Sequence, residues 1–247
     1  MFRFSRLLSF TLILCCCGEI WAQEAAPATE QRQRRTPENP DFDRWESKIQ
    51  EFETWDSRRL PPKNHILFAG ASSIVMWKLN DWYPEWRPIN RGFGGSFMAE
   101  TTHFADRTIL KHEPKVVVLY SGENDIARGS SPETLLEEFK KFVKTIHDPL
   151  PETTIVFLAI KPTEVRWRVI EEIRESNALI KEYCEANDHL EFIDTHTPIL
   201  GEDGRPRKEL FQDAVHLNED GYALWDAELR PVLERVFQPE TKAEGGD

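Results

Sequence analysis

The stretch HILFAGASSIVMW, residues 65–77, contains the local signal that decides the fold. An apolar run typical of a buried strand ends at Gly70, two serines follow at positions 72 and 73, and the next residues have amphipathic helical spacing. A strand, a tight turn and a helix are therefore expected in that order. Each serine could cap the helix, because serine is a preferred N-cap residue, or one of them could be a nucleophile.

The alternation of strand and helix continues to the end of the chain. Further strands are expected at residues 87–90, 115–122, 153–160 and 190–194, with helices near 74–79, 100–110, 131–147, 169–187 and 220–237. Ser131 and Pro132 mark the start of one helix, since serine caps and proline is favoured at the first helical position. Five short apolar strands separated by helices predict an α/β domain whose parallel sheet has helices on both faces.

The first 40 residues have a different character. Two arginines precede an apolar stretch shorter than the roughly 20 residues of a membrane span, and Ala22 offers a small residue for cleavage. Residues 1–22 therefore predict a signal peptide and a secreted or periplasmic protein, although the cysteines at 15–17 leave a lipoprotein signal as an alternative. Residues 23–40 have no apolar periodicity and predict a disordered leader. One domain is expected over residues 41–240.

The charge balance excludes some classes of partner. The 247 residues carry a formal net charge of -12, and removing residues 1–22 changes this to -13, from 29 basic and 42 acidic side chains. Nucleic acids and anionic membranes attract the opposite sign, so neither is expected to bind. Cys184 is the one cysteine after residue 22, so an internal disulfide is not expected and the thiol is predicted to be buried in a helix.

Chemistry is expected at the carboxyl ends of the strands, where ligands bind in open parallel sheets. The loops after the first three strands are rich in glycine and small polar residues, and Asp213 and His216 follow the fifth strand. A histidine backed by a carboxylate can activate a serine hydroxyl, and Gly95 and Asn124 can donate hydrogen bonds to an oxyanion. These loops predict acyl transfer by a serine nucleophile.

A metal site is a second interpretation of the histidines. Asp194, His196, Asp213 and His216 could form a histidine–carboxylate site of a metallohydrolase. The spacing of a zinc-binding HExxH helix is absent from the sequence, and the glycine and asparagine loops would have no role in such a site. The serine mechanism, without metal or cofactor, is favoured.

Four blocks of sequence resemble a known family. FAGASS at 68–73, INRGFGG at 89–95, YSGEND at 120–125 and DAVH at 213–216 are similar, in this order, to the SGNH hydrolases, also called GDSL-like lipases and acylhydrolases. The resemblance implies Ser72 as nucleophile with Asp213 and His216, and Ser72, Gly95 and Asn124 as the oxyanion hole. It also implies an ester hydrolase without cofactor and a flavodoxin-like three-layer αβα sandwich. Ala71 stands where the family usually has aspartate, which puts the rigidity of this loop in question.

The substrate is predicted from the loop after the fourth strand. Lys161, Arg166 and Trp167 fall at the expected rim of the site and are predicted to bind substrate. Export together with cations and tryptophan favours a carbohydrate ester such as an acetylated polysaccharide fragment, and a lipid ester is the alternative. A catalytically decayed carbohydrate-binding protein is a further alternative, although Trp45, Trp55 and Trp225 have the helical spacing of core residues. The retained serine, histidine and aspartate favour an enzyme.

Overall fold

A parallel five-stranded sheet runs through residues 35–58 and 63–237, the part of the chain that the computed structural model describes. The strand order is β2-β1-β3-β4-β5, which is the order of flavodoxin-like folds. The predicted α/β class, with a five-stranded sheet in a three-layer αβα sandwich, is confirmed. The strands are β1 (Ile66–Gly70), β2 (Ile89–Gly92), β3 (Val116–Tyr120), β4 (Thr154–Leu158) and β5 (Leu190–Ile193).

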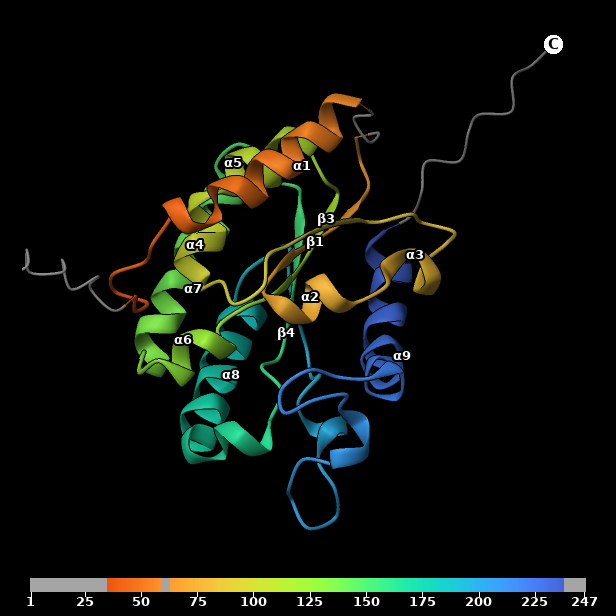
Figure 1. Ribbon diagram of the computed structural model, residues 1–247. Coiled ribbons are helices and arrows are strands. Elements are labelled where there is room, and N and C mark those ends of the chain that lie inside the picture. Colours follow the sequence, from red (N-terminus) through yellow and green to blue (C-terminus); the bar gives the residue numbers. More distant parts are fainter. Residues whose placement is uncertain (1–34, 59–62, 238–247) are drawn as a thin grey trace, which may run out of the picture. The chain divides into compact units, whose positions relative to one another are not determined.

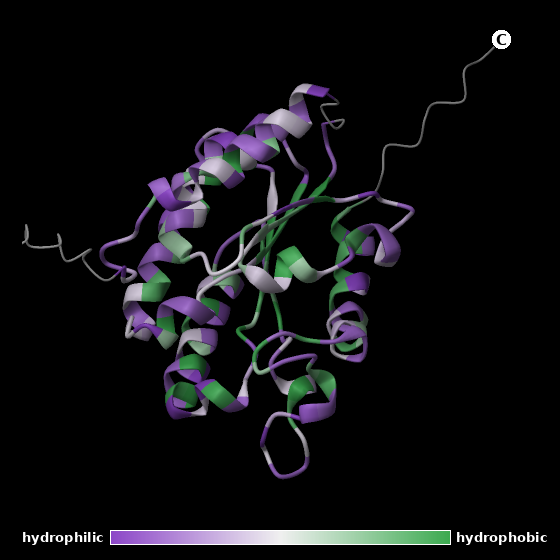
Figure 2. Ribbon diagram, viewed as in Figure 1, coloured by the Kyte–Doolittle hydropathy of each residue, from purple (hydrophilic) through white to green (hydrophobic). Residues whose placement is uncertain are grey.

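The two faces of the sheet form separate hydrophobic layers because successive side chains of a strand point to opposite sides. Leu67 and Ala69 of β1 pack with α7 and α8 on one face, whereas Ile66 and Phe68 pack with α2, α3 and α9 on the other. Figure 1 shows the sheet between these helices, and Figure 2 shows hydrophobic residues along its central strands. The helices are α2 (Ser72–Met76), α3 (Leu79–Trp82), α7 (Pro132–His147), α8 (Ile170–Glu185) and α9 (Glu219–Val236).

Helix α1 (Glu46–Arg58) lies outside the two main layers and has its own small core. Trp45, Ile49 and Phe52 pack against Phe93, which follows β2, and Phe104, which lies between two short helices. This cluster places α1 beside the loop that carries Gly95. The remaining elements are η1 (Asp43–Trp45), α4 (Met98–His103), α5 (Ala105–Thr108), η2 (Leu110–His112), α6 (Glu123–Ala127), η3 (Glu164–Val169), η4 (Thr197–Ile199) and η5 (Lys208–Leu210).

Most predicted elements are found where their sequence signals indicate them. Helix α7 begins at Pro132, and the Ser131 hydroxyl accepts a hydrogen bond from the Thr134 N–H at 3.2 Å. The continuous helix predicted for residues 100–110 is wrong, because the backbone leaves helical geometry at Phe104 and Ile109 and the segment divides into α4, α5 and η2. Phe104 is buried in the cluster beneath α1, a tertiary contact that local periodicity does not report.

Residues 35–40 belong to the described structure, although the sequence predicts a disordered leader there. The Arg35 guanidinium forms an ion pair with the fully buried Glu100. Glu100, which lies 65 residues further along the chain, thus holds Arg35 in a way that the composition of this segment does not indicate. The predicted signal peptide and residues 23–34 of the predicted leader lie outside the described residues, as does the end of the predicted domain at residue 240.

Two tryptophans confirm the expected core packing and one does not. Trp45 and Trp225 are 8% and 0% exposed, but Trp55 is 67% exposed. The buried stripe of α1 consists of Ile49, Phe52 and Asp56, so Trp55 falls beside it and not within it. Cys184 is buried, as predicted. In the described part of the chain, the helices are too short or too polar to span a membrane.

Candidate active site

The turn from β1 to α2 requires a glycine at its first position. Gly70 has φ +121°, and a Cβ atom there would lie 2.0 Å from the Tyr120 carbonyl oxygen, so a side chain cannot be accommodated. The Ala71 N–H donates to that same carbonyl at 3.0 Å, and the Phe93 N–H donates to the Gly70 carbonyl at 2.9 Å. Backbone hydrogen bonds therefore hold this loop although Ala71 supplies no carboxylate.

The two adjacent serines face different surroundings. Ser72 Oγ lies 2.9 Å from His216 Nε2. Ser73 is 1% exposed, and its Oγ lies 3.2 Å from the Nζ of the buried Lys161. The Ser73 carbonyl also accepts a hydrogen bond from the Tyr222 hydroxyl at 2.7 Å, which ties α2 to α9. Ser72 alone of the pair has its hydroxyl beside the histidine.

Asp213 orients His216 from the same loop. Asp213 Oδ1 accepts hydrogen bonds from the N–H groups of Val215 and His216, both at 2.8 Å, while Oδ2 lies 2.7 Å from His216 Nδ1. The hydrogen bond from Val215, with the bonds from His216, holds the Asp213 pKa at about 2, so this carboxylate is ionised and can only accept. Nδ1 of His216 must then carry the proton. In neutral His216, Nε2 is free to accept the proton of Ser72 Oγ.

The loop after β2 turns sharply next to Ser72. The Ser96 N–H donates to the Phe93 carbonyl at 3.3 Å, and Gly95 has φ +82°, the value for the third residue of a type II turn. A Cβ atom on Gly94 would lie 3.7 Å from Ser72 Cβ, so this loop passes close to the serine. Within the described residues, the N–H groups of Gly95 and Ser72 have no hydrogen-bond acceptor.

The side-chain amide of Asn124 has one defined orientation. Its Nδ2 donates to the Ser96 carbonyl at 3.0 Å, and its Oδ1 accepts from Arg166 Nη2 at 3.0 Å. Because an amide nitrogen carries two hydrogens, one N–H of Asn124 remains available. The structure therefore brings Ser72, Gly95 and Asn124 into one region through contacts of their own loops.

Lys161 does not lie at the rim of the site, contrary to prediction. It is 1% exposed, and its Nζ lies 2.6 Å from Glu123 Oε2 and 3.1 Å from the Tyr120 hydroxyl. Burial lowers the pKa of Lys161, whereas Glu123 opposes that shift. Burial alone would raise the pKa of Glu123, but Lys161 and Arg166 together lower it. Lys161 comes directly after Ile160, and its side chain points into the protein interior toward Glu123 and not outward.

The other two predicted substrate residues lie closer to the surface. Arg166 reaches Asn124 with one nitrogen and Glu123 with another, at 2.7 Å from Oε1. Trp167 is half-buried, and the guanidinium of Arg205 lies 4.1 Å from the centre of its ring. The ring face under Arg205 is therefore covered. Arg166 contacts Asn124, one of the predicted oxyanion donors.

His196 lies apart from His216, the histidine that contacts Ser72. Its Nδ1 donates to the Ile160 carbonyl at 2.8 Å, and the ring is 7% exposed beside Asn177 of α8. The Asp194 carboxylate accepts from the His196 N–H at 3.0 Å, so it caps the start of η4. In residues 35–58 and 63–237, groups of three or more side chains suited to metal binding are absent.

Sequence reasoning missed three charged residues of this region, which are Glu123, Glu100 and Arg35. Glu123 and Lys161 follow neighbouring strands, so their pairing could have been suspected from the sheet order. Glu100 accepts from the Phe97 N–H at 2.9 Å and pairs with Arg35. Arg35 gave no sequence signal, because its partner lies far along the chain.

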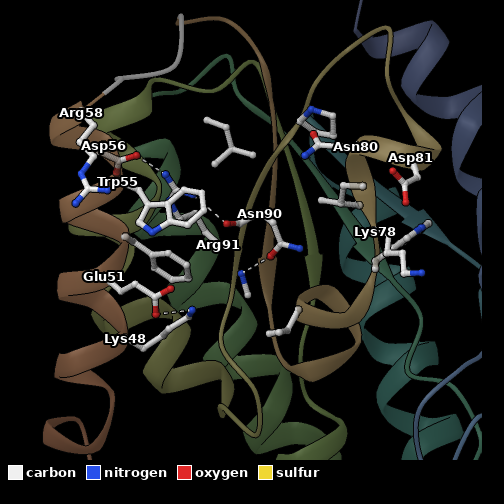
Figure 3. A pocket seen from close by; sticks show the side chains of 17 residues that line it. Lys48, Glu51, Trp55, Asp56, Arg58, Lys78, Asn80, Asp81, Asn90 and Arg91 are labelled. Atoms are coloured by element: carbon white, nitrogen blue, oxygen red, sulfur yellow. Dashed lines mark hydrogen bonds and ion pairs between the residues drawn. The ribbon is translucent and has the colours of Figure 1, made fainter.

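A groove lies between α1 and the segment α2–α3, with the edge strand β2 as its floor. Its volume is about 760 Å³. Figure 3 shows Trp55 lying across the groove toward Arg91, with Lys78 and Asn80 on the opposite wall. Among residues 35–58 and 63–237, the side chains of Lys78 and Asn80 have no hydrogen-bond or ion-pair partner. Val75 lines the end of the groove and stands one helical turn from Ser72.

Comparisons with known proteins identify the family of this chain. A sequence model of the GDSL-like lipase/acylhydrolase family matches residues 68–224, more than half of the chain. A search of curated proteins finds no match. Among solved structures, a Streptococcus pneumonia protein named after platelet activating factor is similar at 22% identity and a TM-score of 0.70, over 78% of this chain and 94% of that one.

Two further solved structures share the fold. A GDSL-like lipase from Bacteroides thetaiotaomicron is 18% identical, with a TM-score of 0.68 over 79% of this chain and 99% of that one. An acetyl esterase variant with a bound acetate ion is 15% identical, with a TM-score of 0.56 over 72% of this chain and 98% of that one. Together with the family match, these observations establish that the chain belongs to the GDSL-like lipase/acylhydrolase family, within the SGNH hydrolase superfamily.

Proposed function

We propose that the chain is an exported serine esterase that cleaves short acyl esters, with acetyl groups on carbohydrates as its substrate class. One observation carries this proposal. Ser72, His216 and Asp213 form a hydrogen-bonded series with distances of 2.9 and 2.7 Å. A hydroxyl, an imidazole and an ionised carboxylate in that order form the arrangement that turns serine into a nucleophile.

The geometry supports a two-step ester hydrolysis. Ser72 Oγ attacks the ester carbonyl carbon while His216 Nε2 takes its proton. The tetrahedral intermediate collapses to an acyl-serine, and His216 returns the proton to the leaving alkoxide, which departs as an alcohol. Water then attacks the acyl-serine while His216 takes its proton, and the bond to Ser72 Oγ breaks as His216 returns the proton to that oxygen, which releases a carboxylic acid and restores the serine. Asp213 stabilises the imidazolium in both steps.

Three donors are available for the negative charge of the intermediate. We assign them to the N–H groups of Ser72 and Gly95 and to the free N–H of Asn124. Donors that are already fixed cost no reorganisation when charge develops on the oxygen, which is the source of their effect on rate. The contacts of Asn124 with Ser96 and Arg166 support this role, because they fix its amide before substrate binds.

The groove beside α2 supports a carbohydrate as the alcohol portion of the substrate. Trp55 offers an exposed apolar ring, and Lys78 and Asn80 offer free polar groups across from it. Sugars have both an apolar face and hydroxyl groups, so this combination suits them better than an acyl chain. The acetyl esterase with bound acetate supports the short acyl portion, since it has the same fold.

The decisive experiment compares the two serines. Ser72→Ala is expected to abolish hydrolysis of p-nitrophenyl acetate, and a serine-directed phosphonate is expected to label the peptide that contains Ser72. Ser73→Ala keeps the His216 contact intact, so it should retain a good fraction of the activity. A dead Ser73→Ala with an active Ser72→Ala would refute the assignment. Wild-type protein inactive toward all esters tested would favour the carbohydrate-binding alternative.

The substrate class is tested separately at Trp55. Trp55→Ala is expected to raise KM for acetylated xylo-oligosaccharides and to leave KM for p-nitrophenyl acetate unchanged, because the smaller ester does not reach the groove. Trp55→Phe keeps a ring for stacking and serves as the matched control. A KM for the acetylated xylo-oligosaccharides that is the same in Trp55→Ala as in wild type would remove the groove from the substrate site and favour a lipid ester.

Export is tested at the other end of the chain. When the full chain is expressed in a bacterium with a secretion system, N-terminal sequencing of the exported protein is expected to begin just after Ala22. Protein that is retained in the cytoplasm with its original N-terminus would contradict this part of the proposal.

A further inference from the structure

Two arginines, each held by a buried glutamate, contact the groups that carry the oxyanion donors. We infer that Arg35 and Arg166 are positioning residues, which align Gly95 and Asn124 for catalysis without touching the substrate. This inference rests on the proposed function, because it assigns a role within the oxyanion hole. It also replaces the substrate-binding role predicted for Arg166 from the sequence.

Arg166 controls the orientation of Asn124. Its Nη2 donates to Asn124 Oδ1 at 3.0 Å, and its Nη1 lies 2.7 Å from Glu123 Oε1. The Glu123 side chain is 7% exposed and is also held by Lys161, so it is a fixed base for the guanidinium. With Oδ1 occupied by a cation, a rotated Asn124 amide would place its NH₂ group against Arg166. The amide is therefore locked with its nitrogen toward the oxyanion position.

Arg35 holds the neighbouring loop. Its Nη2 donates to the Gly95 carbonyl at 2.8 Å, and its Nε donates to Glu100 Oε1 at 2.6 Å. The guanidinium carbon lies 3.7 Å from the centre of the Phe97 ring. Glu100 has no exposed side-chain surface and also accepts from the Phe97 N–H. Arg35 thus fixes the peptide group that follows Gly95.

The two contacts act on one continuous segment. Arg35 holds the Gly95 carbonyl, and Asn124 holds the next carbonyl, that of Ser96, while Arg166 holds Asn124. Arginine suits this task because its planar fork binds a carboxylate with one edge and presents further N–H groups in a fixed direction. Small displacements of a catalytic donor cost rate, so such bracing has a functional effect.

The first test separates positioning from substrate binding at Arg166. Arg166→Met is expected to lower kcat for p-nitrophenyl acetate by about 10-fold or more with little change in KM, which is less than removal of the donor itself. In an Asn124→Ala background, the same substitution should change kcat less than about 2-fold, because the group it positions is gone. Glu123 keeps Lys161 as a partner in this variant, so the fold is expected to persist.

Arg168 provides the matched control, since it is exposed and its one hydrogen bond within the described part of the chain goes to the Ala127 carbonyl at 3.1 Å. Arg168→Met is expected to behave as wild type. An increase in KM for Arg166→Met, or a full loss of kcat that persists in the Asn124→Ala background, would overturn the positioning role and restore the substrate contact.

The second test separates positioning from stability at Arg35. Arg35→Met alone leaves Glu100 as an unpaired buried charge, so this variant is expected to lose thermal stability. Arg35→Met combined with Glu100→Gln removes both charges and keeps an acceptor for the Phe97 N–H. The melting temperature of the double variant should return most of the way to the wild-type value, while its kcat stays about 10-fold below wild type. Recovery of both quantities would make Arg35 a stabilising residue only, and Arg44→Met on the same surface is the control.

A readout without catalysis keeps this inference distinct from the proposed function. In a ¹H–¹⁵N spectrum, the side-chain amide of Asn124 is identified by its disappearance in Asn124→Ala. The hydrogen that Asn124 donates to the Ser96 carbonyl should exchange slowly in wild type and in Arg168→Met, and faster in Arg166→Met. An amide that is unaffected by Arg166→Met would overturn the inference, whatever the esterase assays show.

Discussion

Asp125 gives the sharpest prediction about stability because its surroundings are fully buried. The residue follows Asn124 and is 1% exposed, and its Oδ1 accepts from the Met98 N–H at 3.0 Å at the start of α4. Its Oδ2 has no hydrogen-bond partner within residues 35–58 and 63–237. Burial raises the pKa of Asp125 to about 7, the Met98 N–H opposes the shift, and Glu100 and Glu138 add to it.

The sign and size of the effect follow from this value. Between pH values of about 4 and 7 the folded protein keeps a proton on Asp125 that the unfolded chain has lost, so the free energy of unfolding falls as pH rises. Three pKa units above the ordinary value correspond to about 4 kcal/mol over the whole range. Between pH 5 and pH 8, where Asp125 completes its titration, the free energy of unfolding falls by about 3 kcal/mol.

Asp125→Asn removes the titration and keeps a carbonyl oxygen for the Met98 N–H. Urea unfolding of both proteins at pH 5 and pH 8 gives the difference in stability between them at each pH. Between these two pH values, the free energy of unfolding should fall by about 3 kcal/mol more in the wild type than in the variant. The readout is the change with pH, since an amide with an unpaired N–H shifts the variant by a constant amount. Parallel pH profiles would refute the assignment of a protonated Asp125.

Three further predictions concern the reaction itself. Asn124→Ala should lower kcat by about 10²- to 10³-fold with a much smaller change in KM, and an effect on KM alone would make Asn124 a substrate contact. The enzyme should prefer short acyl groups, because the Gly94 backbone lies close to Ser72. Additional methylene groups would then stay in water and would not contribute the about 0.8 kcal/mol that burial of each provides. A higher kcat/KM for dodecanoyl than for acetyl p-nitrophenyl esters would contradict this. Ester hydrolysis should be unchanged by dialysis against EDTA, whereas loss of activity with rescue by zinc would favour the metallohydrolase alternative.

Local sequence patterns were sufficient to predict the architecture. The central strands β1 and β3 are short apolar runs that are buried on both faces, so they can be recognised without longer-range information. The need for glycine at position 70 is partly local, because its φ of +121° is rarely adopted by other residues. The order of the polar blocks placed Ser72, Asn124 and His216 at one sheet edge, since the carboxyl ends of parallel strands meet there.

Tertiary structure decided the state of the charged residues. Whether Lys161 lies at the rim or beneath it depends on the position of Glu123, which comes from a neighbouring strand 38 residues away. Arg35 is held by Glu100, a buried carboxylate that would otherwise lack this cation, and this pairing exists only in the folded chain. Composition gives the average polarity of a segment, and apolar periodicity indicates which face of a single helix or strand is buried. Ion pairs between distant residues depend on neither, so only the folded chain determines which charges are buried, paired and placed beside Ser72.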